Sequence, residues 1–322
     1  MAKVTIEDIS RDTGLSRGTV SRALNNKPDI AETTRERVLE ACRKLNYVRN
    51  SLARSLATGK CYAVEMVVSD LTHESQARLV NGALSAADEA GYSLRLTEVS
   101  SEAGAAKLAH LGRMPIDGVF IGADLARVAA PPPALGGKSV VSCHPVPGVD
   151  CDRVAPDFVE AGRMSARRLL ATGEKRLLFV SRSEQPEADL TAHGFHEVAK
   201  DGGARVETVV GEEISRLTRV LAEVRAAAAS DDDLALRVLL ICLYEQRVPG
   251  ADIFIIGHGD APCAAGAQLS SVALEREETG RRGVEALLER ISHDRSGPSV
   301  ETRVAPRLVA RQSTEGGWFA GA

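Results

Sequence analysis

Near the start of the chain, four residues are spaced so that they would share one face of a helix: Arg17, Gly18, Ser21 and Arg22. A guanidinium carries forked hydrogen-bond donors that suit phosphate oxygens and the acceptor edge of guanine. Ser21 adds a hydroxyl, and Gly18 permits close approach because it has no side chain. The chemistry that these residues can perform is hydrogen bonding to a nucleic acid.

Two predicted helices position this polar face. Thr5 and Asp8 have the spacing of a capping box, which predicts a short amphipathic helix that ends at Gly14. Ser16 and Thr19 begin a second helix directly after it. Because a turn this short forces the two helices to cross steeply, the pattern predicts a helix-turn-helix whose second helix carries the polar face.

The residues that follow extend the same module. A third helix is predicted from about Glu32 to Leu45. Residues 50–57 form a further short apolar stretch with basic flanks. A helix of this length is marginal in water by itself, so we expect it to fold only against DNA and a second copy of the chain. The apolar face of the third helix is expected to consist of Val38, Leu39, Cys42 and Leu45.

The charge of the chain is distributed unevenly. Residues 1–60 contain twelve Lys or Arg against seven Asp or Glu, a net charge of +5, whereas the whole chain has a net charge of −4. The remaining residues therefore carry −9. A basic module on an acidic body is typical of a phosphate-binding head attached to a domain that does not bind DNA, since Lys and Arg contacts to phosphates release counterions.

The body alternates between predicted strands and predicted helices. With 322 residues and 44% hydrophobic residues, the chain can bury one large or two ordinary cores beyond the head. Strands followed by crossover helices imply parallel, doubly wound sheets. We expect strands at 62–70, 92–99, 118–124, 139–143, 177–181, 206–210 and 252–258, and helices at about 79–90, 160–171, 191–200 and 234–246.

Hydropathy and cysteine spacing indicate a cytoplasmic protein. No stretch approaches the roughly 18 apolar residues of a membrane span, and no signal sequence precedes the first helix. The six cysteines are scattered without a C-x-x-C pair, which in a cytosolic chain indicates reduced thiols. The helix at 234–246 is apolar on almost all sides, so we expect it to serve both the core and a dimer interface.

Motifs for catalysis are absent from the sequence. It contains no P-loop, no G-x-S-x-G and no G-x-G-x-x-G that opens a helix after a strand. His193 and His196 have a spacing that would permit metal ligation but no carboxylate or thiol partner nearby in sequence, so we interpret them as surface histidines. The prediction is a protein that is not an enzyme, with no catalytic residue, no cofactor and no metal site.

The order and motifs of these parts resemble the LacI/GalR family of bacterial transcriptional regulators. The resemblance covers nearly the whole chain and is most specific over VTIEDISRDTGLSRGTVSRALNNKP (4–28) and RERVLEACRKLNYVRNSLARSLATG (35–59). It implies an α/β protein with an all-α helix-turn-helix head and two Rossmann-like subdomains of the periplasmic-binding-protein type, each with a parallel sheet. Three chain crossings would join the subdomains, and an effector would bind in the cleft between them.

The resemblance also implies domain boundaries. The helix-turn-helix domain would span residues 1–48, and a hinge helix with its linker residues 49–60. The first body subdomain would combine residues 61–160 with about 275–305. The second would combine residues 161–274 with about 306–316, which leaves a tail at 317–322.

The family match assigns roles in DNA binding to individual residues of the head. Base-edge reading in the major groove falls to Arg17, Gly18 and Arg22. The hinge residues Asn50 and Ala53 would lie in the minor groove, where Leu56 from each subunit would wedge into the central base step. Phosphate contacts that fix the register fall to Thr5, Ser16, Thr19, Ser21 and Asn25.

The head departs from the family pattern at the start of its third helix. The family usually has Ser as the cap, and this chain has Ala31. We therefore expect Thr33 to cap a slightly later start, at a cost of about 1 kcal/mol.

Ligands of open α/β folds bind beyond the carboxyl ends of the strands, so the polar residues at those positions are candidates for an effector cleft. The family's cleft Arg is replaced here by Thr191, the Asn of its N-D pair by Asp231, and its cleft Asp by Gly259. The sugar-binding residues are thus largely lost. The candidate cleft residues are Asp70, His73, Asp124, His144, Arg182, Thr191, Asp231, His258 and Asp260.

Three explanations of these departures remain open. The ligand could be an acid or a phosphorylated metabolite held by Arg182 or by a histidine, since Arg binds carboxylate and phosphate bidentately. The cleft could lack a small-molecule effector, with control through a protein partner or through the level of the protein; a separate alternative is a redox or metal sensor formed across the cleft by Cys143, His144, Cys151, His258 and Cys263. The alignment could also slip by a residue or two, so that a sugar site survives.

The sequence therefore predicts a cytoplasmic, dimeric, sequence-specific transcriptional regulator, most simply a repressor of a metabolic operon. It would bind a pseudopalindromic operator and respond to an effector, anionic or phosphorylated, that prefers a different closure of the cleft. The alternative is a regulator with a degenerate cleft that is controlled by a protein partner or by redox state. In both cases the expected partners of the protein are double-stranded DNA and a second copy of the chain, and no interaction with a membrane is expected.

Overall fold

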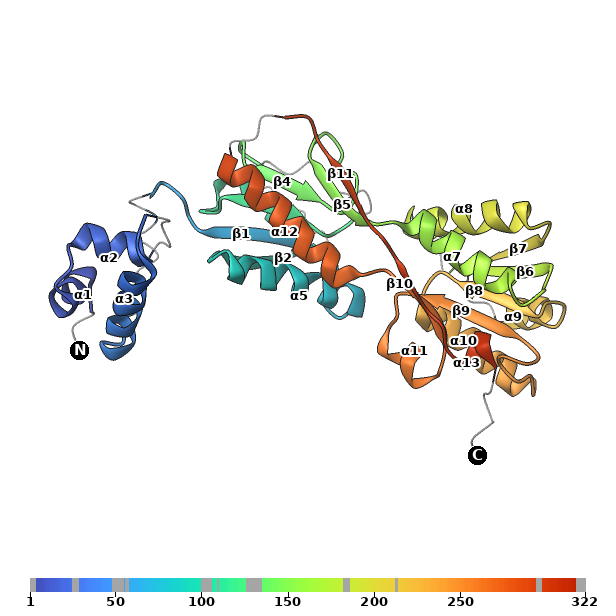
Figure 1. The fold of residues 1–322 in the computed structure, drawn as a ribbon. Coiled ribbons are helices and arrows are strands. Elements are labelled where there is room, and N and C mark those ends of the chain that lie inside the picture. The colour runs from blue at the N-terminus through green and yellow to red at the C-terminus, as the bar shows by residue number, and fades with distance from the viewer. Residues whose placement is uncertain are drawn as a thin grey trace. The chain divides into compact units, whose positions relative to one another are not determined.

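The computed structural model describes residues 4–24, 29–47, 55, 58–99, 106–108, 110–125, 135–181, 186–211, 214–293 and 297–316. The chain divides into two compact units, Met1–Cys61 and Tyr62–Ala322. Figure 1 shows the helical first unit and the α/β second unit. Within the described residues, none of the helices combines the length and apolarity that a membrane crossing needs.

The first unit packs three helices around a small core. They are α1 (Ile6–Thr13), α2 (Arg17–Leu24) and α3 (Glu32–Lys44). The predicted capping box is present, with the Asp8 carboxylate accepting from the Thr5 backbone N–H at 2.9 Å. The Thr5 hydroxyl also donates to this carboxylate, at 2.8 Å. Gly14 ends α1 in a left-handed conformation at φ 68°, as predicted. The buried core consists of Ile9, Val20, Ala23, Val38 and Ala41.

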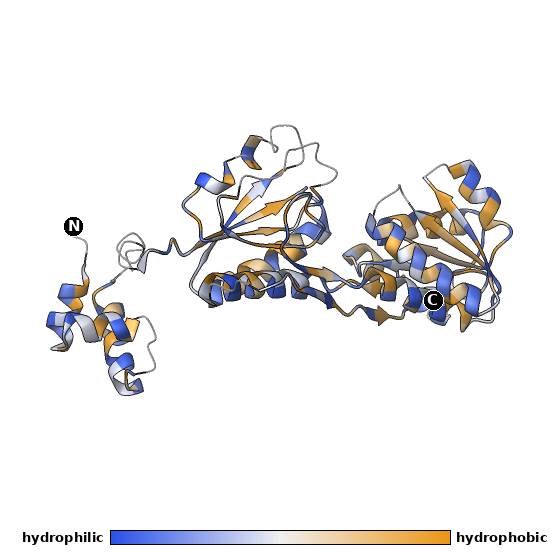
Figure 2. Ribbon diagram, turned by 90° about the horizontal axis from the view of Figure 1, so that it is seen from above, coloured by the Kyte–Doolittle hydropathy of each residue, from blue (hydrophilic) through white to orange (hydrophobic). Residues whose placement is uncertain are grey.

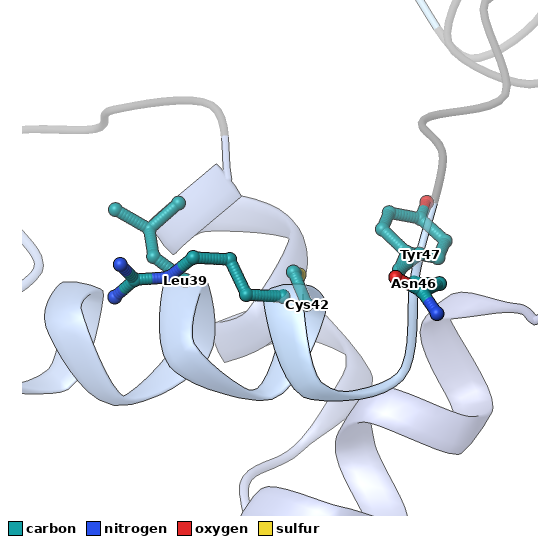
Figure 3. A pocket seen from close by; sticks show the side chains of 5 residues that line it. Leu39, Cys42, Asn46 and Tyr47 are labelled. Carbon is teal, nitrogen blue, oxygen red and sulfur yellow. The ribbon is translucent and has the colours of Figure 1, made fainter.

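Two expectations for α3 are wrong. The helix begins at Glu32 with Ala31 as its cap and no side-chain cap hydrogen bond, so Thr33 does not delay its start. Leu39 is 45% exposed, whereas Ala41 is buried with Val38. The three-residue step from Val38 to Ala41 stays on one helix face, and Leu39 lies about 100° away from it. Leu39 instead lines a surface hollow of about 680 Å³ with Cys42, Arg43, Asn46 and Tyr47 (Figure 3).

The second unit contains two six-stranded sheets. The first sheet is parallel throughout and has the order β11-β5-β4-β3-β1-β2. Its strands are β1 (Ala63–Val68), β2 (Ser93–Glu98), β3 (Gly118–Ile121), β4 (Ser139–Ser142), β5 (Asp152–Pro156) and β11 (Glu301–Val304), and the short helix η1 is Leu111–Arg113.

Two helices, α5 (Glu74–Glu89) and α12 (Arg276–His293), pack together and against this sheet. Their backbones approach closely at two glycines. A Cβ on Gly82 would lie 1.7 Å from the carbonyl oxygen of Glu277, and one on Gly280 would lie 1.9 Å from that of Leu79. Only glycine permits this helix contact.

The second sheet has the order β12-β10-β9-β8-β6-β7. All of its neighbouring strands are parallel except β12, which pairs antiparallel with β10. The strands are β6 (Arg176–Ser181), β7 (Arg205–Val210), β8 (Ala226–Ala229), β9 (Phe254–His258), β10 (Ser270–Ala273) and β12 (Arg307–Val309). The helices are α7 (Phe158–Leu170), α8 (Pro186–Asp201), α9 (Ile214–Leu221), α10 (Asp232–Tyr244), α11 (Pro262–Gly266) and α13 (Gln312–Glu315).

The chain passes between the two sheets three times. It leaves the first sheet after β5 and enters α7, returns after β10 into α12, and leaves again between β11 and β12. We call the two parts of the unit the first half and the second half, after the sheet that each contains. The predicted fold class, a helix-turn-helix head followed by two α/β subdomains, is confirmed.

The strands form the apolar interior of both halves (Figure 2). All six residues of β1 and all four of β8 are buried. The expected strands and helices are present with shifted ends, but the sequence analysis missed β5, β8, β10, β12, α9, α11, α12 and α13. The sequence of β8 is AAAA, which has little intrinsic strand preference, and its central position between β6 and β9 determines its conformation.

Candidate DNA-binding face and ligand site

The polar face of α2 is held outward by a compact turn. The Ser16 hydroxyl accepts a hydrogen bond from the Thr19 backbone N–H at 3.1 Å and lies 2.9 Å from the Thr19 hydroxyl, which fixes the first turn of the helix. Val20 and Ala23 are buried against α1 and α3. On the opposite face, Arg17, Gly18 and Arg22 are exposed and Ser21 is half-buried.

One of these arginines already has an acidic partner. Arg22 forms an ion pair with Asp29, and the two side chains are 59% and 43% exposed. The sequence analysis did not identify Asp29, because it lies seven residues from Arg22 in the segment that follows α2. A carboxylate here holds the guanidinium in place in the free protein and would compete with DNA phosphates for it.

Thr5 is exposed, and both of its donors are directed at Asp8. The backbone N–H of Thr5, followed by its hydroxyl, lowers the pKa of Asp8. Ion pairing between Lys44 and Asp12 at 2.6 Å ties α3 to α1. The remaining predicted DNA contacts, Asn25, Asn50, Ala53 and Leu56, lie outside the described residues.

In the body, two predicted cleft residues lie after β1. Asp70 accepts hydrogen bonds from the Thr72 backbone N–H at 2.8 Å and from its hydroxyl at 2.7 Å. The Thr72 side chain, and then its backbone, lowers the pKa of Asp70. His73 is exposed and forms the cap position of α5. Asp70 therefore organises the turn into α5.

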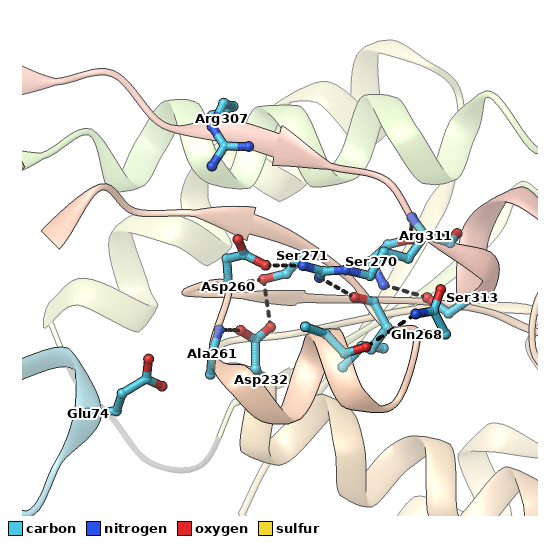
Figure 4. Close-up of polar contacts among 12 residues, drawn as sticks. Glu74, Asp232, Asp260, Ala261, Gln268, Ser270, Ser271, Arg307, Arg311 and Ser313 are labelled. Atoms are coloured by element: carbon cyan, nitrogen blue, oxygen red, sulfur yellow. Dashed lines mark hydrogen bonds and ion pairs between the residues drawn. The ribbon is translucent and has the colours of Figure 1, made fainter. Parts of the chain in front are cut away.

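The acidic residues after β8 and β9 are also bound to the protein itself (Figure 4). Asp231 caps α10 by accepting from the Leu234 backbone N–H at 2.8 Å. Asp260 accepts from Arg311 at 2.6 Å, and its carbonyl accepts from Arg78 of the first half at 2.8 Å. The two carboxylates act in helix capping and in a salt bridge.

Asp232 is the buried member of this cluster. It is 2% exposed and accepts from the Ser271 hydroxyl at 2.6 Å and from the Ala261 backbone N–H at 2.7 Å. Burial raises the pKa of Asp232 to about 6, although both hydrogen bonds oppose the shift. The sequence analysis proposed Asp231 at this position, and the structure buries its neighbour Asp232.

Thr191 and His258 are buried as well. The Thr191 hydroxyl donates to the carbonyl of Glu187 at 2.9 Å within α8. Nδ1 of His258 lies 2.7 Å from the carbonyl oxygen of Ala229, and burial lowers the pKa of the imidazole. Both side chains are thus engaged with backbone, and Arg182 lies outside the described residues.

A cluster that the sequence analysis largely missed joins the two halves of the body. Arg276, the first residue of α12, forms a forked ion pair with Glu187 in the first turn of α8, with N–O distances of 3.3 and 2.8 Å. Nε2 of the predicted cleft residue His144, just beyond β4, lies 3.6 Å from the same carboxylate. Burial lowers the pKa of His144, although Glu187 and then Asp124 act in the opposite direction, so the imidazole is neutral at pH 7.

Three of the cysteine thiols have strongly raised pKa values. Burial raises the pKa of Cys143 to about 12 and that of Cys242 to about 11. The pKa of Cys263 is also raised to about 11, by burial and then by its hydrogen bond to Asp233. Thiols with such pKa values are protonated at neutral pH and are weak nucleophiles. Among the described residues, no group of three His, Cys, Asp or Glu side chains is arranged to hold a metal ion.

Comparison with protein families gives one match in each of the two compact units. Residues 5–50 match the model of bacterial regulatory proteins of the lacI family. Residues 166–314 match that of the periplasmic binding protein-like domain.

Individual relatives extend over nearly the whole chain. The HTH-type transcriptional regulator CelR of Thermobifida fusca is 26% identical, covering 96% of this chain and 98% of CelR. The HTH-type transcriptional repressor PurR of Haemophilus influenzae is 24% identical, with 97% and 98% covered. A Lac repressor dimer bound to operator and the anti-inducer ONPF has a similar fold, with a TM-score of 0.72, 21% identity, and 97% and 99% of the chains covered.

Proposed function

Because the chain belongs to the LacI family of bacterial regulatory proteins, we propose that it is a sequence-specific transcriptional repressor that binds a pseudopalindromic operator as a homodimer in the cytoplasm. The observation that carries the proposal is the exposed basic face of α2 on a packed three-helix core. PurR and the Lac repressor, which are similar to this chain, are repressors by name.

In the proposed complex, α2 lies in the major groove. Arg17 and Arg22 read base edges, and Gly18 allows close approach. Residues 50–57 form the hinge, with Asn50 and Ala53 in the minor groove and Leu56 as the wedge. The phosphate contacts come from Thr5, Ser16, Thr19, Ser21 and Asn25.

The proposed dimer uses the outer surface of α10. Leu240 and Tyr244 on this helix are 56% and 87% exposed, although the opposite face of α10 is buried in the core. Exposed apolar side chains on one helix favour contact with a second copy. The dimer sets the spacing of the two heads, and thereby their fit to two half-sites one helical turn apart.

The proposed control is a ligand that binds between the halves of the body and changes their closure. Polar groups from both halves meet there, including His144 and Glu187. The Lac repressor structure contains a small molecule, the anti-inducer, and by analogy we propose an effector here. The domain division proposed above places this cleft between the two subdomains.

A second candidate function is a repressor controlled by a protein partner. The observation that favours it is that Asp231, Asp260 and Thr191 are each already bound within the protein. A cleft whose polar groups are satisfied internally gains little from a small polar ligand, since each contact made replaces one that is lost.

The test is selection of DNA sites from a random library by the full chain, followed by titration with salt and with small molecules. We expect an enriched site with two-fold pseudosymmetry and an affinity that falls steeply with salt. Absence of any enriched site would refute the repressor. A site that no small molecule releases, but that a protein captured on the body does release, would favour the second candidate.

A further inference from the structure

We infer that Arg276 is the anchor for a carboxylate-bearing ligand, and that Glu187 is a built-in carboxylate which this ligand displaces. The inference rests on the proposed function, because it names the ligand class of the proposed cleft and the way in which that ligand changes the protein. It assigns the anionic ligand to Arg276, a residue that the sequence analysis did not consider.

Arg276 is arranged as a carboxylate receptor. Its side chain is 10% exposed, and it presents both terminal nitrogens to one carboxylate. The centre of the guanidinium lies 5.2 Å from the ring centroid of Phe158, which supports its flat face. Its Nε is buried and has no hydrogen-bond partner among the residues that the structure describes. A ligand oxygen can therefore gain a donor that Glu187 leaves unused.

Glu187 is the member of the pair that can leave. Its side chain is 29% exposed, compared with 10% for Arg276, so it can turn toward water while the guanidinium stays in place. An arriving carboxylate replaces a departing one, so the net charge around Arg276 and His144 does not change. The exchange thus avoids the cost of an uncompensated buried charge.

Displacement of Glu187 would affect the closure of the body. Glu187 belongs to α8 of the second half, whereas its partners belong to the first half, Arg276 through α12 and His144 through the end of β4. A ligand on Arg276 therefore removes contacts that hold the halves together at this point. Such a ligand prefers a different closure, which is the requirement for shifting the conformational equilibrium.

The position of the pair agrees with the general location of ligands in α/β folds. His144 directly follows β4, and Asp124, whose charge acts on His144, follows β3 at the same edge of the first sheet. Ligands of parallel sheets bind beyond the carboxyl ends of the strands. The Arg276–Glu187 pair lies at this edge.

The test is calorimetric titration of the full chain with acetate, which stands in for the removed carboxylate. Glu187→Ala is expected to bind acetate roughly ten-fold or more tightly than the unmodified chain, because nothing then competes for Arg276. The double variant Glu187→Ala, Arg276→Met is expected not to bind it. Glu89→Ala is the matched control, since Glu89 forms a forked pair with Arg281 at 3.0 and 3.1 Å on the exposed surface of the first half.

Equal acetate binding by Glu187→Ala and Glu89→Ala, or by the single and double variants, would overturn the inference. Tighter binding of inorganic phosphate than of acetate would overturn the carboxylate assignment. If Arg276→Met does not fold, as judged by circular dichroism, Arg276→Lys replaces it in the double variant. Lysine lacks the forked donors of arginine, so acetate binding as tight as in Glu187→Ala alone would then contradict the inference.

Operator binding without any ligand separates this inference from the proposed function. Glu187→Ala is expected to weaken operator binding several-fold, because it removes the contacts to Arg276 and His144 that hold the two halves of the body together. Glu89→Ala removes no such contact and is expected to leave operator binding unchanged. Unchanged operator affinity in Glu187→Ala overturns the coupling step alone. Failure of the unmodified chain to bind any operator overturns the proposed function instead.

Discussion

The head and the body of this protein differ in what their polar residues do. On α2 the polar face is exposed, and its arginines project from a small apolar core toward the solvent. In the body, three carboxylates at the strand ends are held by the protein itself: Asp231 caps a helix, Asp260 forms an ion pair, and Asp232 is buried. The face of the head is accessible to another molecule, whereas a ligand of these body residues would have to replace an internal contact.

The largest expected effect tests how closely two helices of the body, α5 and α12, pack against each other. Gly280→Ala places a Cβ 1.9 Å from the carbonyl oxygen of Leu79, so α5 and α12 must separate. We expect a loss of about 3 kcal/mol in the free energy of unfolding, measured by urea denaturation. Gly266→Ala is the control, because a Cβ there meets nothing within 4 Å. Equal stability of the two variants would show that the helix pair is not closely packed.

The next effect concerns the head. Arg22→Ala removes a proposed base contact, and we expect it to weaken binding to the selected operator by about 10- to 100-fold, which corresponds to about 1–3 kcal/mol. Arg282→Ala, which removes an exposed arginine paired with Glu278 on α12, should leave binding unchanged. Fluorescence anisotropy with labelled duplex measures both. A loss shared by the two variants would indicate general electrostatics in place of specific reading.

Asp232 gives the stability of the body a dependence on pH. Its folded pKa of about 6 exceeds the ordinary value of 3.8, so the folded state binds the proton more tightly. The stabilisation is complete below about pH 4 and is lost as the pH rises through 6, with a slope of at most about 1.4 kcal/mol per pH unit.

Asp232→Asn is expected to remove this decline, as measured by urea denaturation between pH 4.5 and 7. The exposed neighbour Asp233 provides the control, because Asp233→Asn leaves the buried carboxyl in place. An identical decline in Asp232→Asn and in the unmodified chain would contradict the assignment.

The smallest expected effect concerns the ion pair between Arg22 and Asp29, and tests whether this pair limits access of DNA to the polar face of α2. Asp29→Asn removes the acidic partner of Arg22 and one negative charge near the DNA. We expect binding to random-sequence duplex to strengthen by about two- to five-fold at low salt, since an exposed ion pair is worth at most about 1 kcal/mol. Asp201→Asn in the body is the control. Weaker binding in Asp29→Asn would mean that the pair positions Arg22 for DNA.

The sequence predicted the head better than the body for a physical reason. The elements of the head depend on neighbours three or four residues apart, such as Thr5 with Asp8 and Ser16 with Thr19, and the capping box is present as predicted. The same local reasoning failed at Leu39, where the choice of core face depends on how α3 meets the other two helices.

In the body, the decisive contacts are long-range. Arg276 and Glu187 are 89 residues apart, and neither residue type nor spacing reveals that they pair. The alternation of strands and helices predicted the fold class, but β8 with its four alanines becomes a strand only through its central place in the sheet. His258 was placed correctly at the end of its strand, whereas Thr191 lies inside α8 and not at its start. Sequence could not show that the Thr191 hydroxyl and Nδ1 of His258 are bound to backbone.

The central claim, that α2 reads DNA bases, is tested most directly by a cycle of one protein change and one DNA change. Affinity is measured for the unmodified chain and for Arg22→Ala, each on the selected operator and on an operator with one half-site base pair replaced. If Arg22 reads that pair, the replacement weakens binding of the unmodified chain by about 10- to 100-fold and that of Arg22→Ala by much less. Equal losses in both proteins at every half-site position would contradict base reading by Arg22.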